Sequence, residues 1–550
     1  MERHLAAMRL TSLARPIAVL ALAAGLSAAN AAAPKTPAKA RPKTPPVVSS
    51  LPAGTKLDGP ALARHIDEAI ASRIRAEQVS SSPLCDDAEF LRRVYLDITG
   101  HIPPAEKATT FLDSREPNKR AKLIDELLAG SDYGKHQADI WQNLLLPRTS
   151  DNRFIQFDKM TKWLEANFNE NKPWDQMTRA IVTAEGDMDK NGAVLYFLAN
   201  ATPDKLTDNA TRSFLGVQLQ CAQCHNHPFT EWKQNEYWGM AAFFTKVRFE
   251  GNPRQAARQG GTVQVHEGGK GRQVRLPISA KRVPPKFFQG EEPKLSSSDA
   301  YRPVLANWMT SPKNPYFSKA MVNRTWAQFF GRGIVNPVDD MHDGNQPSHP
   351  QLLADLSSQF AANGFDVKHL IRGICNSETY QRTSKPSAGN RDAGPELFSR
   401  MAVKVMTPEQ MFDSLGQVLG APTPGNRPRR QGAAAIRFRN ITPRMLFVNF
   451  FKGDENADPT EYQAGIPQVL RLMNAPRLNN AAMLTPVLKS GKSQTQIVEH
   501  LYLTTLSRRP TPHELDRTLA LVRKYHDEPR QAYGDILWAL LNSSEFTLNH

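Results

Sequence analysis

Hydrophobic side chains recur along most of the chain with the period of an α-helix. Ile66, Ile70 and Ile74 are four residues apart, a spacing that places them on one face of a helix. The chain is therefore predicted to be mainly α and multi-helical. Further helices with this periodicity are expected at residues 90–96, around 111–112, at 122–128, 133–146, 157–168, 174–183, 207–220, from 301 onward, at 469–473 and at 498–506.

Helix starts are marked most clearly at Thr407 and Thr511. Each threonine precedes a proline, and Gln410 or Glu514 follows at the third helical position. A threonine N-cap with Gln or Glu at that position can close a capping box, in which two otherwise unpaired backbone N–H groups find acceptors. We therefore predict that helices begin directly after these two threonines.

A short sequence echo connects two regions far apart in the chain. The echo consists of Tyr95-Leu96 followed by Pro103-Pro104-Ala105-Glu106, and of Tyr502-Leu503 followed by Pro510-Thr511-Pro512-His513-Glu514. A helix, a turn and a capped second helix would explain both segments. An internal duplication and the independent recurrence of turn chemistry both account for such an echo.

Residues 250–299 interrupt the helical pattern. This stretch contains glycine pairs and short alternating runs at 262–265 and 273–276, which indicate a small β-hairpin or a loop insert. The interruption divides the chain into two predicted helical domains, at residues 57–249 and 300–550.

The first residues have the features of an export signal. Arg3, Arg9 and Arg15 precede the short apolar run at 17–25, and Ala29-Asn30-Ala31 offers small residues for cleavage. We expect a signal peptide at residues 1–31, followed at 32–56 by a disordered linker rich in Pro, Ala and Lys. The predicted location is the periplasm or the exterior, with no transmembrane anchor, because the apolar run is too short to span a bilayer.

The chain is basic, with a formal net charge of +15. Such a charge favours nucleic-acid binding in the cytosol, but predicted export argues against a nucleic-acid partner. Outside the inner membrane the charge fits attraction to anionic lipid headgroups or to an anionic polysaccharide, or simply a solvated surface.

The cysteine pattern points to chemistry at one place. Cys221-Ala222-Gln223-Cys224-His225 has the CxxCH spacing of haem c attachment, in which two thioethers hold the haem and the histidine ligates the iron. Two alternatives stay open: a short-loop disulfide, and a zinc or copper site that adds His225 and His227 to the two sulfurs. Cys85 and Cys375 are isolated, and their pairing is not indicated by the spacing.

A second polar segment, residues 337–350, offers further ligands. It contains Met341, His342 and His349 among aspartates, glycine and prolines. His349 and Met341, with Met240 elsewhere, are candidates for a second iron ligand. The same segment could instead hold a divalent cation, supply an acid and a base, or be an ordinary turn.

An aromatic run directly follows the CxxCH sequence. Such residues could cover the apolar edge of a haem, or they could be ordinary core. The run comprises Phe229, Trp232, Tyr237, Trp238, Phe243 and Phe244.

Several motifs together resemble a known family. The N-terminal half contains Phe90-Leu91-Arg92-Arg93-Val94-Tyr95-Leu96-Asp97-Ile98-Thr99-Gly100, residues 168–175 and residues 214–229, and the C-terminal half contains Val322-Asn323-Arg324-Thr325-Trp326, residues 329–333, Pro347-Ser348-His349-Pro350 and residues 541–546. The chain is similar to secreted proteins first recognised in planctomycetes, in which a cytochrome-c-like domain (PSCyt type) precedes a planctomycete-specific C-terminal domain (PSD). The resemblance covers nearly all of residues 60–550 and concerns domains of unknown function. It implies an association with secreted sulfatase-like proteins and with polysaccharide-related redox work.

Three hypotheses of function follow. The first is a monohaem c-type cytochrome-like protein that exchanges electrons with a redox partner. The second is a non-haem periplasmic scaffold that binds a polysaccharide or a sulfatase-like partner. The third is a metal-dependent hydrolase that uses Asp339, Asp340, His342 and His349. The sequence lacks a nucleotide-binding glycine loop, a His-Glu-x-x-His and a Gly-x-Ser-x-Gly, and whether the protein is an enzyme stays open.

Overall fold

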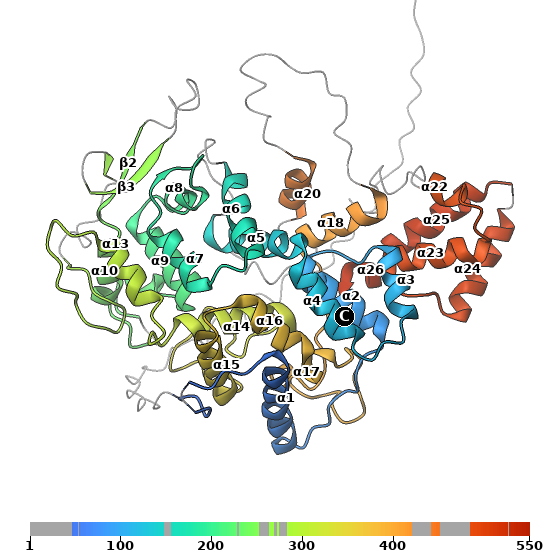
Figure 1. The fold of residues 1–550 in the computed structure, drawn as a ribbon, viewed down its shortest axis with the longest axis horizontal. Helices are drawn as coiled ribbons and strands as arrows, with labels where there is room; N and C mark the ends of the chain where they lie inside the picture. Colours follow the sequence, from blue (N-terminus) through green and yellow to red (C-terminus); the bar gives the residue numbers. More distant parts are fainter. Residues whose placement is uncertain are drawn as a thin grey trace, which may run out of the picture. The chain divides into compact units, whose positions relative to one another are not determined.

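The described part of the chain is built mainly of α-helices, as predicted (Figure 1). The computed structural model describes residues 47–52, 54–147, 156–227, 230–251, 263–268, 272–273, 283–420, 442–451, 484–525 and 527–550. The predicted signal peptide, the first part of the predicted linker and the predicted helix at 469–473 lie outside the described residues.

The helices have the following bounds. In the first half of the chain they are α1 (Gly59–Ala76), α2 (Asp87–Thr99), α3 (Ala105–Asp113), α4 (Lys119–Ala129), α5 (Ser131–Leu145), α6 (Phe157–Asn169), α7 (Trp174–Val182), α8 (Leu195–Asn200), α9 (Pro203–Leu215) and α10 (Gln234–Ala242). In the second half they are α13 (Tyr301–Met309), α14 (Phe317–Phe330), α15 (Pro350–Ala362), α16 (Val367–Asn376), α17 (Glu378–Gln381), α18 (Pro408–Leu419), α20 (Pro443–Phe451), α22 (Thr485–Leu488), α23 (Gln494–Leu506), α24 (Pro512–Lys524), α25 (Pro529–Leu541) and α26 (Ser544–Thr547).

Both predicted capping boxes are confirmed. The Thr407 hydroxyl accepts from the Gln410 N–H at 3.2 Å, and the Gln410 side chain accepts from the Thr407 N–H at 3.0 Å. Thr511 and Glu514 form the same pair of bonds at 3.3 and 2.7 Å. These contacts fix the first residues of α18 and α24.

The two echo segments have the same local geometry. α2 ends at Gly100, which has a φ of 76°, and α23 ends at Ser507, which has a φ of 60°. In each case the next helix, α3 or α24, begins five residues after this left-handed residue. The predicted helix, turn and second helix are therefore present in both places.

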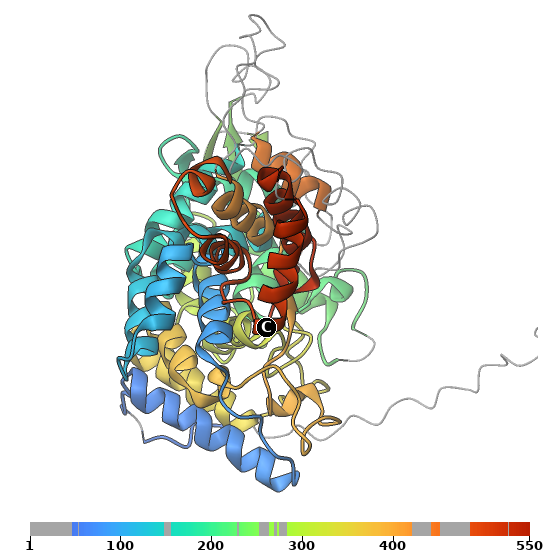
Figure 2. The ribbon, with the colours of Figure 1, turned by 90° about the vertical axis from the view of Figure 1, so that its right-hand side faces the viewer.

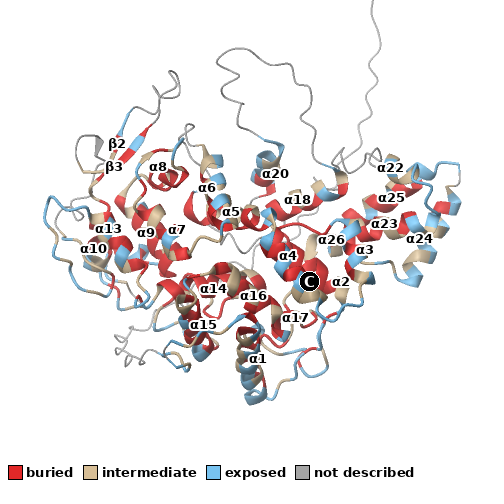
Figure 3. Ribbon diagram, viewed as in Figure 1, coloured by how far each residue is buried: buried red, intermediate tan, exposed pale blue. Residues whose placement is uncertain are grey.

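The helices surround two apolar cores that meet at α2. The first core draws mainly on α1–α10 and α13–α17, and the second mainly on α18 and α22–α26. α2 contributes Phe90, Leu91 and Val94 to the first core and Leu96 to the second. A helix that contacts apolar surroundings on more than one side must be buried nearly all round, and residues 89–99 are all buried (Figure 3).

The polar residues of α2 are paired with distant parts of the chain. The Arg92 guanidinium donates to the carbonyls of Thr505, Glu545, Phe546 and Leu548 at 2.7–3.3 Å. Arg93 donates to the carbonyls of Tyr380, Arg382 and His550 at 2.6–3.2 Å. The Asp97 carboxylate accepts from Tyr380, Lys404 and Asn549 at 2.6–2.8 Å. α2 therefore fastens residues 545–550 between the two cores.

The two predicted helical segments share the first core. Phe214 of α9 and Phe329 of α14 belong to the same apolar cluster. α1 lies alongside α16, as two views of the ribbon show (Figures 1 and 2). The predicted division at residues 250–299 is thus not a division between cores.

The predicted insert contributes to a small antiparallel sheet. Its strands are β1 (Gly186–Asp187), β2 (Val247–Glu250), β3 (Gln264–Glu267) and β4 (Arg272–Gln273), in the order β1-β3-β2-β4. Glu267, at the end of β3, accepts from the backbone N–H groups of Tyr301 and Arg302 at 2.6 and 3.1 Å. This carboxylate joins the sheet to the first turn of α13. A separate pair of strands, β5 (Lys404–Val405) and β6 (Leu548–Asn549), lies beside α2.

The predicted linker makes contact with the folded part earlier than expected. Ser49 and Ser50 bind the Asp355 carboxylate of α15 through both hydroxyls and the Ser50 N–H, at 2.6–2.9 Å. His65 of α1 lies 2.9 Å from the same carboxylate. Residues 49 and 50 are therefore held against α15.

Candidate functional site

The helix before the cysteine motif ends sooner than predicted. We expected a helix to continue to residue 220, but α9 ends at Leu215 and Gly216 follows with a φ of 67°. A Cβ on Gly216 would lie 3.2 Å from the Met341 sulfur and 3.3 Å from the Ala320 Cβ. Left-handed backbone and close packing both require glycine here, and together they end the helix.

The cysteines stand on a short 3₁₀ turn at the surface. This turn, η2 (Gln220–Gln223), contains Cys221, and Cys224 follows as its C-terminal cap. Side chains three residues apart eclipse in a 3₁₀ helix, so the two thiols are presented toward one side. Both cysteines are exposed and unbridged, whereas Cys85 and Cys375 are buried. Burial raises the pKa of the Cys85 and Cys375 thiols, which makes them poor nucleophiles.

A backbone carbonyl orients the ring of His225. The His225 Nδ1 lies 2.7 Å from the Asn226 carbonyl oxygen. Because a carbonyl can only accept, Nδ1 carries the proton and Nε2 keeps its lone pair. Metal-ligating histidines are commonly fixed in this way, with the second nitrogen donating to a carbonyl or carboxylate. His225 is exposed, so Nε2 is accessible.

The first turn of α10 holds the cysteine turn in place. The Gln234 side-chain amide donates to the carbonyls of Gln223 and Cys224 at 3.1 and 2.8 Å. The Trp238 indole N–H also donates to the Gln223 carbonyl, at 3.1 Å. The Gln234 N–H donates to the Asn226 Oδ1 at 3.0 Å. Through Asn226, α10 therefore also fixes the residue that orients His225.

The polar segment at 337–350 lies beside this turn. The Met341 N–H donates to the Gly216 carbonyl at 3.0 Å, and His342 packs edge-on against Trp232 at 6.0 Å between ring centres. On its other side Trp232 contacts His227 at 5.4 Å. The fold thus brings His342 and His227 together around one indole.

His227 and His342 carry their protons differently from His225. Nδ1 of His227 accepts from the Thr230 N–H at 3.1 Å, and Nδ1 of His342 accepts from the Gly344 N–H at 3.0 Å. In neutral form each ring therefore carries its proton on Nε2. The His342 Nε2 lies 3.5 Å from the Asp340 carboxylate. Burial, and then the nearby His342, lower the pKa of His227.

The other candidate ligands are not on the exposed turn. His349 is buried against Phe398 at the start of α15, where Nδ1 lies 3.1 Å from the Ser348 hydroxyl and burial lowers its pKa to about 4. Met240 is buried within α10. Asp339 forms an ion pair with Arg324. Of the four residues of the hydrolase hypothesis, the described contacts bring together only Asp340 and His342.

The described aromatic residues of the run are part of the core. Trp232, Tyr237, Trp238, Phe243 and Phe244 are all buried, and Phe229 lies outside the described residues. Their apolar surfaces face inward, while Trp238 binds the back of the cysteine turn.

The sequence interpretation missed Gln234, Trp238 and Asn226 as supports of the turn. Their contacts cross up to fifteen residues and follow no local period that would reveal them.

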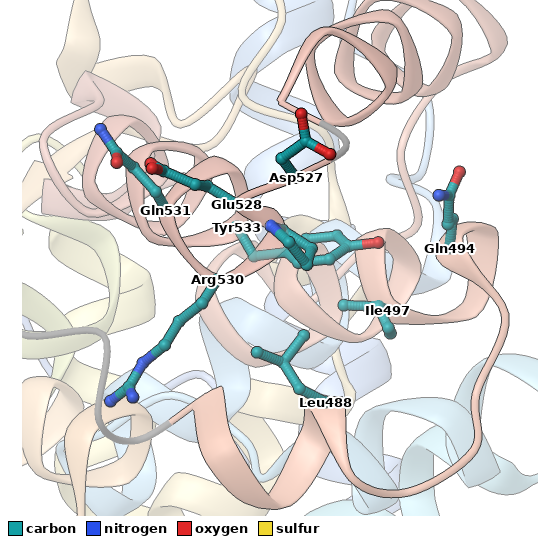
Figure 4. Close-up of a pocket in the computed structure, with 9 residues that line it drawn as sticks. Leu488, Gln494, Ile497, Asp527, Glu528, Arg530, Gln531 and Tyr533 are labelled. Carbon is teal, nitrogen blue, oxygen red and sulfur yellow. The ribbon is translucent and has the colours of Figure 1, made fainter.

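The part of the chain that the structure describes contains no ready-made metal site at the turn. Within the described ranges, no three His, Cys, Asp or Glu side chains are arranged to hold a metal ion. A shallow pocket lies in the region of the second core, and neither cysteine nor histidine lines it (Figure 4). Its lining combines Leu488, Ile497 and Tyr533 with the charged residues Asp527 and Arg530.

Two family models match the chain in sequence order. PSCyt2, described as a protein of unknown function (DUF1549), matches residues 65–249, and PSD1, described as a protein of unknown function (DUF1553), matches residues 301–522. Comparison with the curated proteins and with the solved structures gave no significant match. The chain therefore belongs to the planctomycete-type family in which a PSCyt domain of unknown function precedes a PSD domain of unknown function.

Proposed function

We propose that this chain is an exported monohaem c-type cytochrome-like protein that transfers electrons. Cys221 and Cys224 would form the two thioether bonds, and the Nε2 of His225 would ligate the iron. A haem held in this way supplies a one-electron redox couple. The other residues of the site hold the turn that carries these three side chains.

The observation that carries the proposal is that the CxxCH turn is exposed, whereas the other family motifs have structural roles within the fold. Arg92, Arg93 and Asp97 of the first motif are buried and paired. Asn323 of the Val-Asn-Arg-Thr-Trp motif binds the backbone of Val335 and Val338. The Pro-Ser-His-Pro motif begins α15. Cys221, Cys224 and His225 instead present reactive atoms to solvent.

The residues of the turn fit the demands of haem attachment. The 3₁₀ geometry presents both sulfurs toward one side, and the Asn226 carbonyl selects the tautomer of His225 that a metal needs. Gln234 and Trp238 hold the turn in that conformation through three hydrogen bonds to its carbonyls. The chain thus supplies the attachment points, the ligand and the support, while a second axial ligand is not assigned.

The proposed location is the periplasm or the exterior, on the strength of the signal-like residues 1–31. Within the described ranges, every helix is too short or too polar to span a bilayer. The proposed partner is a redox protein, with secreted sulfatase-like proteins and anionic polysaccharides as further candidates from the family resemblance and the net charge of +15.

The test is covalent haem attachment to the purified protein. The chain is secreted in a bacterial host with and without the cytochrome c maturation system, and the product is examined by visible spectroscopy and by haem staining of a denaturing gel. We expect stain only with the maturation system, its loss in the double variant Cys221→Ala/Cys224→Ala, and its retention in the matched variant Cys85→Ala.

His225 is examined in the same experiment. We expect His225→Ala to give a haem spectrum different from that of the parent if attachment still occurs, because the iron loses its ligand. A colourless, folded parent protein in the presence of the maturation system would overturn the proposal, and metal analysis of that protein would then distinguish the zinc or copper alternative from bridged thiols.

A further inference from the structure

A pair of ionisable side chains, Asp208 and Tyr237, lies on the helices that precede and follow the cysteine turn, α9 and α10. Asp208 of α9 has one carboxylate oxygen, Oδ1, that is buried without a hydrogen-bond partner in the described structure. Tyr237 of α10 is fully buried, and its hydroxyl interacts with the Asp208 carboxyl and donates to the Asp204 carbonyl at 3.3 Å. A buried carboxyl oxygen without a donor is unfavourable for the ionised form.

The pair is connected to the turn through one face of α10. Gln234, Tyr237 and Trp238 are at positions i, i+3 and i+4, which places them on the same side of the helix. Gln234 and Trp238 bind the Gln223 and Cys224 carbonyls. Tyr237, between them, reaches α9, and the Cys224 thiol is close enough to act on its ionisation.

Two other ionisable groups act on Asp208, and the helices that pack on α9 carry several more. On α9, Asp204 raises the pKa of Asp208 and Arg212 lowers it. α8 contributes Tyr196, whose hydroxyl donates to the Leu206 carbonyl. α14 contributes Lys319 and Arg324, of which Arg324 is paired with Asp339 and also donates to the Arg212 carbonyl. α5, which also packs on α9, contributes Asp139, paired with Arg444, and the buried His136. None of the groups on α5, α8 and α14 is among those that shift the pKa of Asp208.

We propose that Asp208, supported by Tyr237, takes up a proton when the centre on Cys221 and Cys224 is reduced. This inference rests on the proposed function. In the coupled step a one-electron donor would give one electron to the centre. One proton would pass from solvent to the Asp208 carboxylate, and this carboxylate would become a carboxylic acid. The charge added by the electron is thereby balanced.

The direction of the coupling follows from electrostatics. The oxidised centre has one more positive charge than the reduced centre, and a nearby positive charge favours the ionised carboxyl. Reduction removes that charge and raises the affinity of Asp208 for a proton. Burial already raises the pKa of Asp208 to about 6, so the change of protonation falls in a pH range where the protein can be studied. The midpoint potential should therefore fall as the pH rises.

The experiment is a potentiometric titration of the haem-loaded full chain with redox mediators between about pH 4.5 and 8.5. We expect the potential to fall with pH around pH 6, with a slope that approaches but does not exceed about 59 mV per pH unit, the limit for one proton per electron. Asp208→Asn should abolish this dependence. The matched variant Asp204→Asn should retain it, at slightly lower pH, because a neighbouring negative charge is removed.

Tyr237→Phe provides a second test that a structural role would not mimic. The Tyr237 hydroxyl, which interacts with the carboxyl, lowers the pKa of Asp208, so its removal should move the pH-dependent range upward. A haem protein whose potential is independent of pH, or equally dependent on pH in Asp208→Asn, would overturn this inference and leave the proposed function intact. A colourless protein would overturn both.

Discussion

Replacing Arg92 with methionine should destabilise the protein strongly. The guanidinium is buried and donates four hydrogen bonds, to Thr505, Glu545, Phe546 and Leu548 at 3.0, 3.2, 2.7 and 3.3 Å. Hydrogen bonds from a charged group contribute about 1.5–3 kcal/mol each, and buried acceptors left without a donor are costly. Desolvation of the buried charge, which also lowers the pKa of Arg92 to about 10, offsets part of this sum. We expect a net loss of about 3–5 kcal/mol in the free energy of unfolding.

Two measurements test this expectation. Urea unfolding followed by tryptophan fluorescence gives the global change, and amide hydrogen exchange at residues 545–549 gives the local one. Arg92→Lys keeps the charge but lacks the planar guanidinium group. It should therefore lose less stability than Arg92→Met. Arg517→Met, on the exposed face of α24, serves as the surface control and should change stability by less than about 0.5 kcal/mol. A loss below about 1 kcal/mol in Arg92→Met, with unchanged exchange at residues 545–549, would refute the role assigned to this residue.

Two further predictions concern contacts on the surface of the folded part. Gln234→Leu should lower the stability of the cysteine turn by about 1–2 kcal/mol, because two hydrogen bonds to the Gln223 and Cys224 carbonyls are lost. Amide hydrogen exchange at residues 221–226 should be faster in this variant but not in Asn235→Leu, which changes an exposed neighbour. Equal exchange in the two variants would contradict the prediction. Asp355→Ala should release residues 48–51 and make them sensitive to limited proteolysis, since the carboxylate that binds Ser49 and Ser50 is removed. The control variant Asp343→Ala, at an exposed site, should be cleaved at the same rate as the parent protein.

Local sequence patterns were sufficient for much of the helical fold. Ile66, Ile70 and Ile74 are buried on one face of α1, and the helix starts after Thr407 and Thr511 lie where the capping chemistry placed them. These features depend on contacts within about four residues, so a periodic pattern or a single motif can reveal them. The alternating run at 262–265 likewise indicated β3.

The surroundings of the cysteine turn could not be predicted in the same way. The end of α9 depends on the contact of Gly216 with Met341, more than a hundred residues later. The meeting of His227, Trp232 and His342 also depends on how α9, α10 and the 337–350 segment pack. The burial of Arg92 and Arg93 could not be predicted for the same reason. The sequence Phe-Leu-Arg-Arg-Val-Tyr-Leu has an amphipathic pattern, and the distant residues 545–550 provide acceptors for both guanidinium groups.

The attachment of residues 545–550 to α2 has a consequence for biosynthesis. α2 is made early, but three of the four carbonyl groups that bind Arg92, and one of the three that bind Arg93, belong to residues 545–550, more than 450 positions later. Without those residues, Arg92 keeps only the Thr505 carbonyl among these acceptors and Arg93 keeps those of Tyr380 and Arg382, so that α2 lacks part of its stabilisation in the place where the two cores meet. A nascent chain interrupted before residue 545 would therefore keep apolar surface open to proteases.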